Sequence, residues 1–265
     1  MLVLLPPSEG KAASGPGVPL ALDGLSLPGL TTARENVLAA LVKLCSGDTD
    51  RAAEVLGLSP GLRGEVARNT GLLTAGARPA GEVYTGVLFD ALGLATLDEA
   101  AYGRAERALL VFSGLWGAVR ITDRIPSYRC SMGVKLPPLG ALGAYWRSAT
   151  ATVLPEVADG LVLDLRSSAY AAAWKPAGEL LGRTATVRVL QEREVDGVPK
   201  RSVVSHFNKA TKGRLVRDLL VAGAEPKTPD ELVDALLALG YRVEVAARGT
   251  ARKAWQLDVV VTEIH

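Results

Sequence analysis

The sequence predicts an α+β fold, a single compact unit with a mixed β-sheet flanked by helices. Three apolar runs, Leu2–Leu5, Leu109–Phe112 and Leu161–Leu165, have the length of short buried strands. Helical patterns separate these runs, but without the regular strand–helix alternation of a doubly wound protein. Two segments near the end of the chain each indicate a hairpin. We found no internal repeat and no linker, so we expect one domain over residues 1–265.

The first half of the chain is predicted to be mostly helical after its first strand. Pro6 and Pro7 end that strand because proline cannot donate to a β-ladder. A flexible loop rich in Gly, Pro, Ser and Ala follows over residues 12–30. Capping boxes at Thr32/Glu35 and Thr96/Glu99 each predict the start of a helix. Between them, further helices are expected from Asp50 to about Gly57, from Ser59-Pro60, and around VYTGVLFDAL.

The second half predicts helices and two hairpins. The expected helices are Ala141–Val157, AYAAAWK capped by Ser167 or Ser168, NKATKGRLVRDLLVAG, and a helix from Thr228 to Leu239-Gly240. The first expected hairpin joins Thr184–Val195 to Arg201–Phe207 through the turn Asp196-Gly197, and the second joins Tyr241–Ala246 to Trp255–Ile264.

Composition limits the class of protein. The chain is 48% apolar and 22% charged with a net charge of +2, so it is globular and not a uniformly basic nucleic-acid coat. Two distant cysteines and two histidines offer no spacing for a metal site, so we expect no metal and no cofactor. MLVLL is too short for a signal peptide and no apolar stretch approaches the roughly 20 residues of a membrane span. We therefore expect a cytoplasmic protein with no membrane partner.

The segment from Ser113 to Lys135 is the first candidate for function. It contains Gly114 and Gly117, and it follows a predicted strand. Its cations are Arg120, Arg124, Arg129 and Lys135, against the single acid Asp123. Backbone N–H groups and guanidinium groups in such a loop can hold an anion. The alternative is a surface loop with solvated arginines.

A second basic cluster runs from Lys200 to Arg217 without an acid between them. Lys209, Lys212 and Arg214 belong to its helical part, where Lys209 and Lys212 share a face. This pattern can hold a phosphate, and its alternative is a solvated helix face. Lys11, after Gly10 in PPSEGK, can also approach an anion, although the GxxxxGK[ST] spacing of a phosphate loop is missing.

Polar residues at predicted strand ends permit a second hypothesis, an enzyme acting on a small anionic or nucleotide-like substrate. The candidate catalytic residues are Ser8, Glu9, Asp164, Ser167 and Tyr170. The Asp164 carboxylate needs a partner, for which Arg129, Lys175 or Lys209 are candidates. The hypothesis requires Lys11, Asp164 and Lys209 to converge within about 15 Å. Neighbouring positive charge is expected to lower the pKa of the Cys130 thiol, although a single such cysteine is more often inert.

Five segments resemble the YaaA family, also known as DUF328 or UPF0246. They are LLPPSEGK, VYTG, SGLWGAVRITDRIPSYRCSMG, DLRSSAY and SHFNKATKGRLVR, and they occur in order over nearly the whole chain. The resemblance implies a cytoplasmic protein that limits oxidative damage during hydrogen peroxide stress, by way of lowered free iron. It also implies an α+β fold of unusual topology with a positively charged cleft.

The resemblance further implies DNA binding through an element like a helix-hairpin-helix. Here that element maps onto the helix before Ser113 and the turn SGLWGAVR. The sequence departs from the usual Gly-x-Gly because its glycines are three apart, and Leu109–Phe112 is predicted as a strand.

The leading hypothesis is therefore a DNA-binding stress protein. A positively charged cleft would contact phosphates of duplex or distorted DNA. Its lining would be Lys11, Arg120, Arg124, Arg129, Lys135, Lys209, Lys212 and Arg214. Trp116 or Tyr128 would stack on an exposed base, unless they pack in the core. Direct sequestration of iron is disfavoured because the chain lacks a suitable ligand set.

Overall fold

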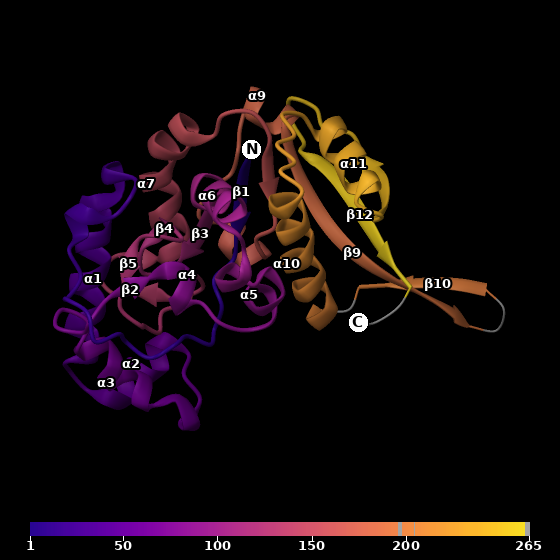
Figure 1. Cartoon of the computed structure of the whole chain (residues 1–265). Helices are drawn as coiled ribbons and strands as arrows, with labels where there is room; N and C mark the ends of the chain where they lie inside the picture. The colour runs from indigo at the N-terminus through magenta and orange to yellow at the C-terminus, as the bar shows by residue number, and fades with distance from the viewer. Residues whose placement is uncertain (196–197, 204, 263–265) are drawn as a thin grey trace.

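A mixed β-sheet in the strand order β11-β12-β9-β8-β1-β3-β4 runs through the protein, and β10 pairs with β9. The computed structural model describes residues 1–195, 198–203 and 205–262 (Figure 1). The strands of this sheet are β1 Leu2–Leu5, β3 Leu109–Ser113, β4 Gly117–Arg120, β8 Val162–Asp164, β9 Thr184–Val195, β10 Val198–Ser202, β11 Arg242–Ala247 and β12 Trp255–Val261. Two small sheets pair β2 (Arg78–Pro79) with β5 (Arg124–Ile125) and β6 (Lys135–Leu136) with β7 (Gly140–Ala141).

Strand directions make the sheet mixed, as expected. β1 is parallel to both β3 and β8, and β9 is parallel to both β8 and β12. The pairs β3–β4, β9–β10 and β11–β12 are antiparallel. Every residue of β1 and β3 is buried, which is typical of central parallel strands covered on both faces. The α+β prediction with a mixed sheet flanked by helices is confirmed.

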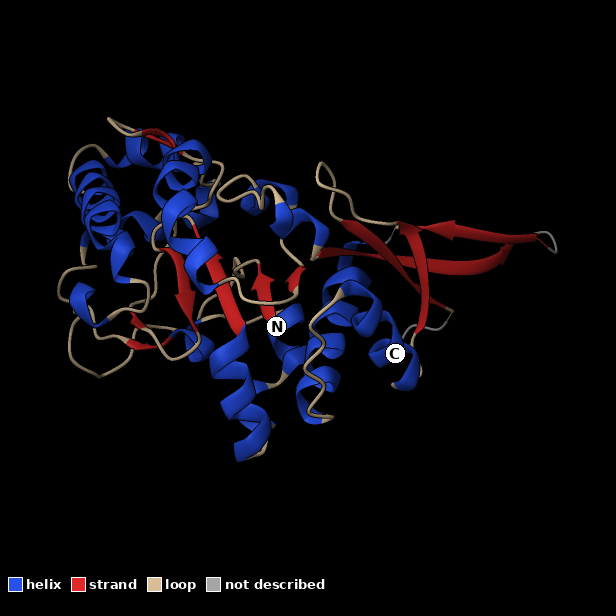
Figure 2. Ribbon diagram, turned by 90° about the horizontal axis from the view of Figure 1, so that it is seen from above, coloured by secondary structure: helices blue, strands red, loops and turns tan. Residues whose placement is uncertain are grey.

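Helices cover the sheet and set the position of the site. They are α1 Thr31–Cys45, α2 Thr49–Leu56, α3 Gly64–Thr70, α4 Ala80–Val83, α5 Val87–Leu92, α6 Glu99–Ala108, α7 Leu142–Val157, α8 Ser168–Ala171, α9 Glu179–Gly182, α10 Ser205–Val221 and α11 Pro229–Ala238, with short 3-10 helices at Leu22–Gly24, Pro28–Leu30, Pro60–Leu62 and Leu94–Thr96. α10 packs against α5, α6 and β9, and α11 packs against β11. The β9–β10 hairpin extends away from the rest of the molecule (Figure 2).

The segment after α6 corrects the helix-hairpin-helix prediction. Leu109–Ser113 is strand β3, which pairs antiparallel with β4 through the turn Gly114–Trp116. The Ser113 hydroxyl oxygen accepts hydrogen bonds from the backbone N–H groups of Leu115 (3.1 Å) and Trp116 (2.9 Å). Gly114 is needed for close packing, because a Cβ there would lie 2.5 Å from the carbonyl oxygen of Cys130. The element is a β-hairpin, and the strand prediction for Leu109–Phe112 is confirmed.

One of the predicted helix caps is confirmed and two are wrong. Thr228 caps α11 by accepting from the backbone of Glu231, as expected. The capping boxes at Thr32 and Thr96 are wrong, because α1 begins at Thr31 without a side-chain cap and Asp98 caps α6. The helix around VYTGVLFDAL is split into α4 and α5 at Gly86, whose φ of 100° only glycine adopts readily.

Of the two hairpins predicted near the end of the chain, the second is confirmed and the first differs in its return strand. The pairing of β11 with β12 confirms the second hairpin up to the last described residues. In the first, the return strand is Val198–Ser202, and residues from Ser205 onward already belong to α10. The predicted turn at 196–197 lies outside the described residues, as does Ile264. Within the described part of the chain, no helix is long and apolar enough to cross a membrane.

Candidate functional site

A pocket lies at the carboxyl ends of β1 and β8. These parallel strands pair Leu4 with Asp164, so the segments that follow them leave the sheet at one edge. The pocket has a volume of about 340 Å³. We call it the strand-end pocket, and its lining is Pro6, Pro7, Ser8, Glu9, Gly10, Thr85, Gly86, Val87, Leu88, Phe89, Ser167, Tyr170 and Lys209. Four distant parts of the sequence therefore meet here: the loop after β1, the start of α5, the start of α8, and α10.

Several predicted residues come together in this pocket. Ser8, Glu9, Ser167 and Tyr170 line it, and Lys209 joins them from α10. The Ser8 hydroxyl donates to the carbonyl of Gly10, which closes the loop on itself. Burial, followed by the nearby charge of Glu9, raises the pKa of Tyr170 to about 12, so its phenol is protonated at neutral pH.

Lys11 lies behind the loop and is not part of either lining described here. Its ammonium group donates to the carbonyl of Ser8 at 2.8 Å and lies 4.6 Å from the ring centroid of Tyr128. Burial lowers its pKa to about 8, although the carboxylate of Glu9 acts in the opposite direction. The Tyr128 hydroxyl lies 2.6 Å from the Ser113 hydroxyl and 3.0 Å from that of Tyr84. Lys11 therefore holds the loop from inside through hydrogen bonding and cation–π contact.

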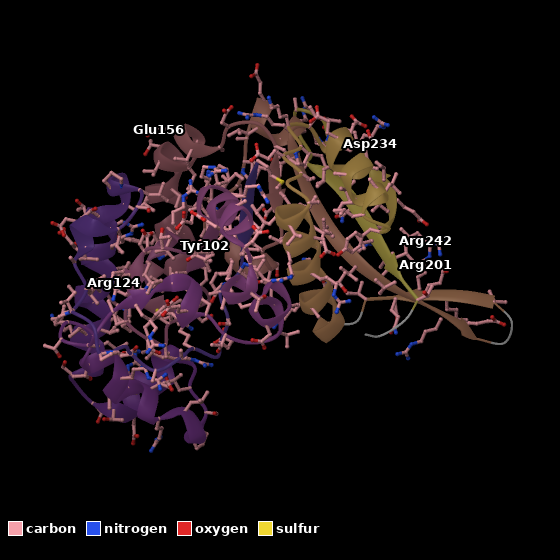
Figure 3. All side chains as sticks on the ribbon, viewed as in Figure 1. Tyr102, Arg124, Glu156, Arg201, Asp234 and Arg242 are labelled. Atoms are coloured by element: carbon pink, nitrogen blue, oxygen red, sulfur yellow. The ribbon has the colours of Figure 1, made fainter. Side chains whose placement is uncertain are left out.

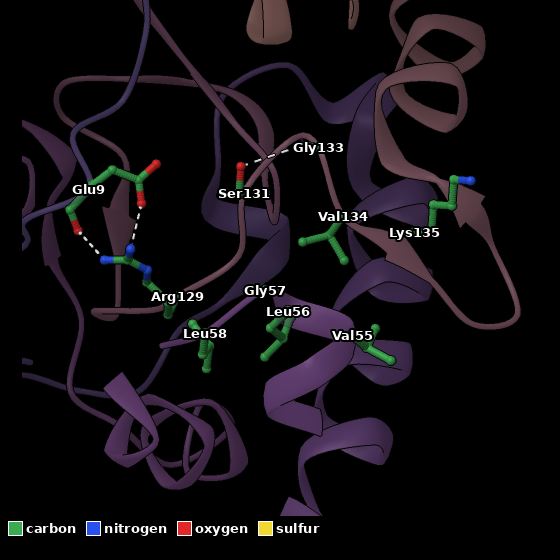
Figure 4. Close-up of a pocket in the computed structure, with 10 residues that line it drawn as sticks. All are labelled: Glu9, Val55, Leu56, Gly57, Leu58, Arg129, Ser131, Gly133, Val134 and Lys135. Atoms are coloured by element: carbon green, nitrogen blue, oxygen red, sulfur yellow. Dashed lines mark hydrogen bonds and ion pairs between the residues drawn. The ribbon is translucent and has the colours of Figure 1, made fainter. Parts of the chain in front are cut away.

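A second, more open cavity of about 570 Å³ shares Glu9 with the strand-end pocket, and Figure 4 shows its lining. We call it the open cavity, and its lining is Glu9, Val55, Leu56, Gly57, Leu58, Arg129, Ser131, Gly133, Val134 and Lys135. The Arg129 guanidinium group pairs with the Glu9 carboxylate at 3.0 Å and donates to the Glu9 carbonyl at 3.1 Å. Glu9 lines both cavities, so the two are neighbours.

Asp164 has a different partner from those expected. Its carboxylate forms a two-pronged ion pair with Arg166, with N···O distances of 2.9 and 2.7 Å. The Arg166 guanidinium group also donates to the Trp174 carbonyl and stacks 4.1 Å from the ring centroid of Phe112. The expectation that Arg129, Lys175 or Lys209 pairs with Asp164 is wrong. The signal was present in Asp-Leu-Arg, because residues two apart in extended chain point to the same side.

Three of the remaining predicted cations donate hydrogen bonds to backbone carbonyls. Lys212 donates to the Leu165 carbonyl at 3.4 Å, and burial lowers its pKa while Asp164 opposes that shift. Arg120 donates to the Arg107 carbonyl, and Arg124 donates to the Ala77 carbonyl at 2.8 Å. Figure 3 shows Arg124 at the opposite end of the molecule from Arg201 and Arg242. In the described part of the chain, neither Arg120 nor Arg124 lines the two spaces.

Both aromatic candidates for base stacking belong to the core. Trp116 is fully buried and Tyr128 is 1% exposed. Their rings meet edge to face with centroids 5.9 Å apart. Core packing, the alternative considered for them, is what the structure shows.

Of the three residues on which the enzyme hypothesis depends, only Lys209 lines the strand-end pocket. Asp164 is engaged by Arg166, and Lys11 by Ser8. The apolar wall Val87–Phe89 was not predicted to take part, because apolar residues at helical spacing carry no chemical signal.

Both cysteines are free and buried. Burial raises the pKa of Cys130 to about 12 and also raises that of Cys45. The expected lowering of the Cys130 pKa is wrong, because desolvation outweighs the nearby cation.

We therefore expect native protein at pH 8 to resist iodoacetamide at Cys130, since about one thiol in ten thousand is ionised four units below its pKa. Mass spectrometry of protein alkylated with and without urea measures this. Rapid labelling of Cys130 in the native protein would contradict the assignment.

These features define an α+β protein with polar residues gathered at the carboxyl ends of two parallel strands. A family model described as peroxide stress protein YaaA matches residues 1–247, and the chain belongs to that family. A UPF0246 protein of Streptomyces coelicolor is 71% identical over 266 residues, covering all of both chains. A UPF0246 protein of Corynebacterium efficiens is 43% identical over 251 residues, covering 92% of this chain and 95% of that one.

Proposed function

We propose that this protein acts in the peroxide stress response by binding DNA through phosphate contacts on the side of the molecule that carries the strand-end pocket and the open cavity. The observation that carries the proposal is that the cations near the two cavities lack carboxylate partners, whereas the cations of the C-terminal part of the sheet have them. Lys135 lines the open cavity and Lys209 lines the strand-end pocket, and both are exposed. Arg214, five residues further along α10, is exposed as well, but at 3.6 residues per turn it does not share a face with Lys209.

Among the described residues, no carboxylate lies within salt-bridge distance of Lys135, Lys209 or Arg214. The C-terminal part of the sheet is different. There Arg201 and Arg242 share the carboxylates of Glu192 and Glu244. Positive potential is therefore expected to concentrate around Lys135 and Lys209, which favours the approach of a phosphate backbone.

Phosphate contacts also offer a route to protection from oxidation. Lysines that neutralise phosphates release the cations condensed on DNA. Iron bound at phosphates belongs to those cations. Occupancy of DNA by this protein would thus limit iron-dependent damage where the protein is bound.

We expect the logarithm of duplex affinity to fall linearly with the logarithm of salt concentration. Lys135→Met and Lys209→Met should each weaken binding and reduce the slope by about 0.9, the value for one phosphate contact. Fluorescence anisotropy with a labelled duplex at several salt concentrations measures both quantities.

Lys227→Met is the matched control. Lys227 is exposed, and its carbonyl lies near Gly160, which precedes β8, at the sheet edge opposite the two cavities. The duplex affinity of Lys227→Met and the slope of that affinity with salt should equal those of the unaltered protein. Absence of binding at low salt, or an affinity that does not depend on salt, would overturn the proposal.

A further inference from the structure

We propose that the strand-end pocket is a binding site for a small organic phosphate with a heteroaromatic body, the chemistry of a nucleoside monophosphate. The site shares Lys209 with the proposed DNA-binding surface, and it requires no catalytic step. Its volume of about 340 Å³ lies at the small end of the range for small-molecule pockets, roughly 300–1,000 Å³.

Two walls of the pocket are apolar. Pro6 and Pro7 form part of one, and the run Val87–Phe89 at the start of α5 forms part of the other. Apolar walls with a few convergent polar groups are typical of small-ligand sites, where apolar surface supplies affinity and polar groups supply orientation. Such walls suit the faces of a ring system and leave a fully hydrated ion without partners.

The polar groups select for an anion. Glu9 is the carboxylate of the lining, and its charge is engaged by Arg129 on the side of the open cavity. Lys209 has no carboxylate within salt-bridge distance in the described part of the chain. Its ammonium group therefore supplies the uncompensated charge of the pocket.

Two residues with hydroxyl groups line the same pocket, Ser167 and Tyr170. Ser167 is exposed, and its hydroxyl makes no hydrogen bond within the described residues, so it is available to a ligand. Tyr170 adds a phenol that stays protonated at neutral pH. An ammonium group and several hydroxyl donors suit the multiple oxygens of a phosphate.

The pocket is held in shape before any ligand arrives. The loop after β1 is fixed by Lys11 on the Ser8 carbonyl and by Arg129 on the Glu9 carbonyl. The wall formed by the start of α5 is fixed by the packing of α5 on α10. A preformed site avoids the entropic cost of ordering loops on binding.

Isothermal titration calorimetry on the full chain, without DNA, tests the proposal with adenosine and guanosine monophosphates as probes. We expect saturable binding of at least one of them. Adenosine, which lacks the phosphate, and ribose 5-phosphate, which lacks the base, should each bind at least tenfold more weakly, about 1.4 kcal/mol. Inorganic phosphate alone should bind more weakly still.

Two variants locate the binding. Ser167→Phe should abolish it by filling the pocket, whereas Ser168→Phe, one residue along and outside the lining, should leave it unchanged. Lys209→Met should weaken the monophosphate at least tenfold, with little effect on adenosine.

Three results would overturn the assignment. They are no binding of either monophosphate at millimolar concentration, adenosine binding as tightly as its monophosphate, and undiminished binding in Ser167→Phe. Ser167→Phe should keep the salt-dependent affinity for DNA that Lys135 supports. The DNA proposal and the monophosphate proposal can therefore fail separately.

Discussion

Replacement of Arg166 by methionine is expected to lower the free energy of unfolding by about 3–5 kcal/mol, because it leaves a buried carboxylate without its counter-ion. The side chain of Arg166 is 0% exposed and that of Asp164 is 10% exposed. The guanidinium group also hydrogen-bonds the Trp174 carbonyl and stacks on Phe112, so the loop after β8 loses its anchor as well. Urea unfolding followed by circular dichroism measures the change.

Arg51→Met is the matched control for this prediction. Arg51 pairs with Glu54 one helical turn away, and both side chains are more than half exposed. Exposed pairs of this kind contribute about 0.3–0.5 kcal/mol, so the variant should remain close to the unaltered protein. The double variant Asp164→Asn with Arg166→Met should recover part of the lost stability. A change below about 1 kcal/mol in Arg166→Met would show that water reaches the Asp164 carboxylate.

The arrangement of the sheet was predictable as far as local pattern determines it. Leu2–Leu5 and Leu109–Phe112 are continuous apolar runs, and both are buried strands of the sheet. Pairing order was not predictable, because β1 lies between β3 and β8, strands that follow it by more than a hundred residues. Nothing in a local run of leucine and valine specifies which distant run will lie beside it.

The composition of the strand-end pocket was partly predictable, because local pattern also shows where the buried strands end. Polar residues after buried strands, such as Ser8, Glu9 and Ser167, gather at the edge where parallel strands end. The grouping of the predicted cations, from Lys11 to Arg214, into one cleft was inferred from charge alone. The donation of Arg120 and Arg124 to backbone carbonyls was not predictable, because a sequence does not display such contacts.

Charge alone also misjudged Cys130 and Asp164. The sign of a pKa shift depends on burial as well as on neighbouring charge. Cys130 has a cation nearby in the sequence, but its burial raises the pKa. Asp164 found its partner two residues away rather than in a distant cluster.

The contact between α5 and α10 gives the second large effect, because it supports the apolar wall of the strand-end pocket. Gly213 lies in the interior of α10 and is buried. A Cβ at this position would meet the Leu88 carbonyl oxygen and would lie 3.0 Å from the Cβ of Ala91. Helix α5 would have to move away, since the obstruction is backbone rather than a flexible side chain.

Gly213→Ala is therefore expected to destabilise the protein by about 1–3 kcal/mol, the usual cost of overpacking, despite the better helix propensity of alanine. Gly103→Ala in α6 is the matched control, because it is also a glycine inside a helix and its new Cβ would lie 3.7 Å from the end of the Arg107 side chain. That variant should gain about 0.4–1 kcal/mol from reduced freedom of the unfolded chain.

The two variants are expected to change the free energy of unfolding in opposite directions, and this difference separates tertiary packing from helix propensity. If Gly213→Ala were as stable as Gly103→Ala, α5 would not be pressed against α10 as the structure shows. The same displacement should also change the pocket, since Leu88 lines it. We therefore expect Gly213→Ala to weaken nucleoside monophosphate binding at temperatures where the variant is still folded, while Gly103→Ala binds as the unaltered protein does. Loss of stability with undiminished binding would show that the wall formed by Val87–Phe89 does not contact the ligand.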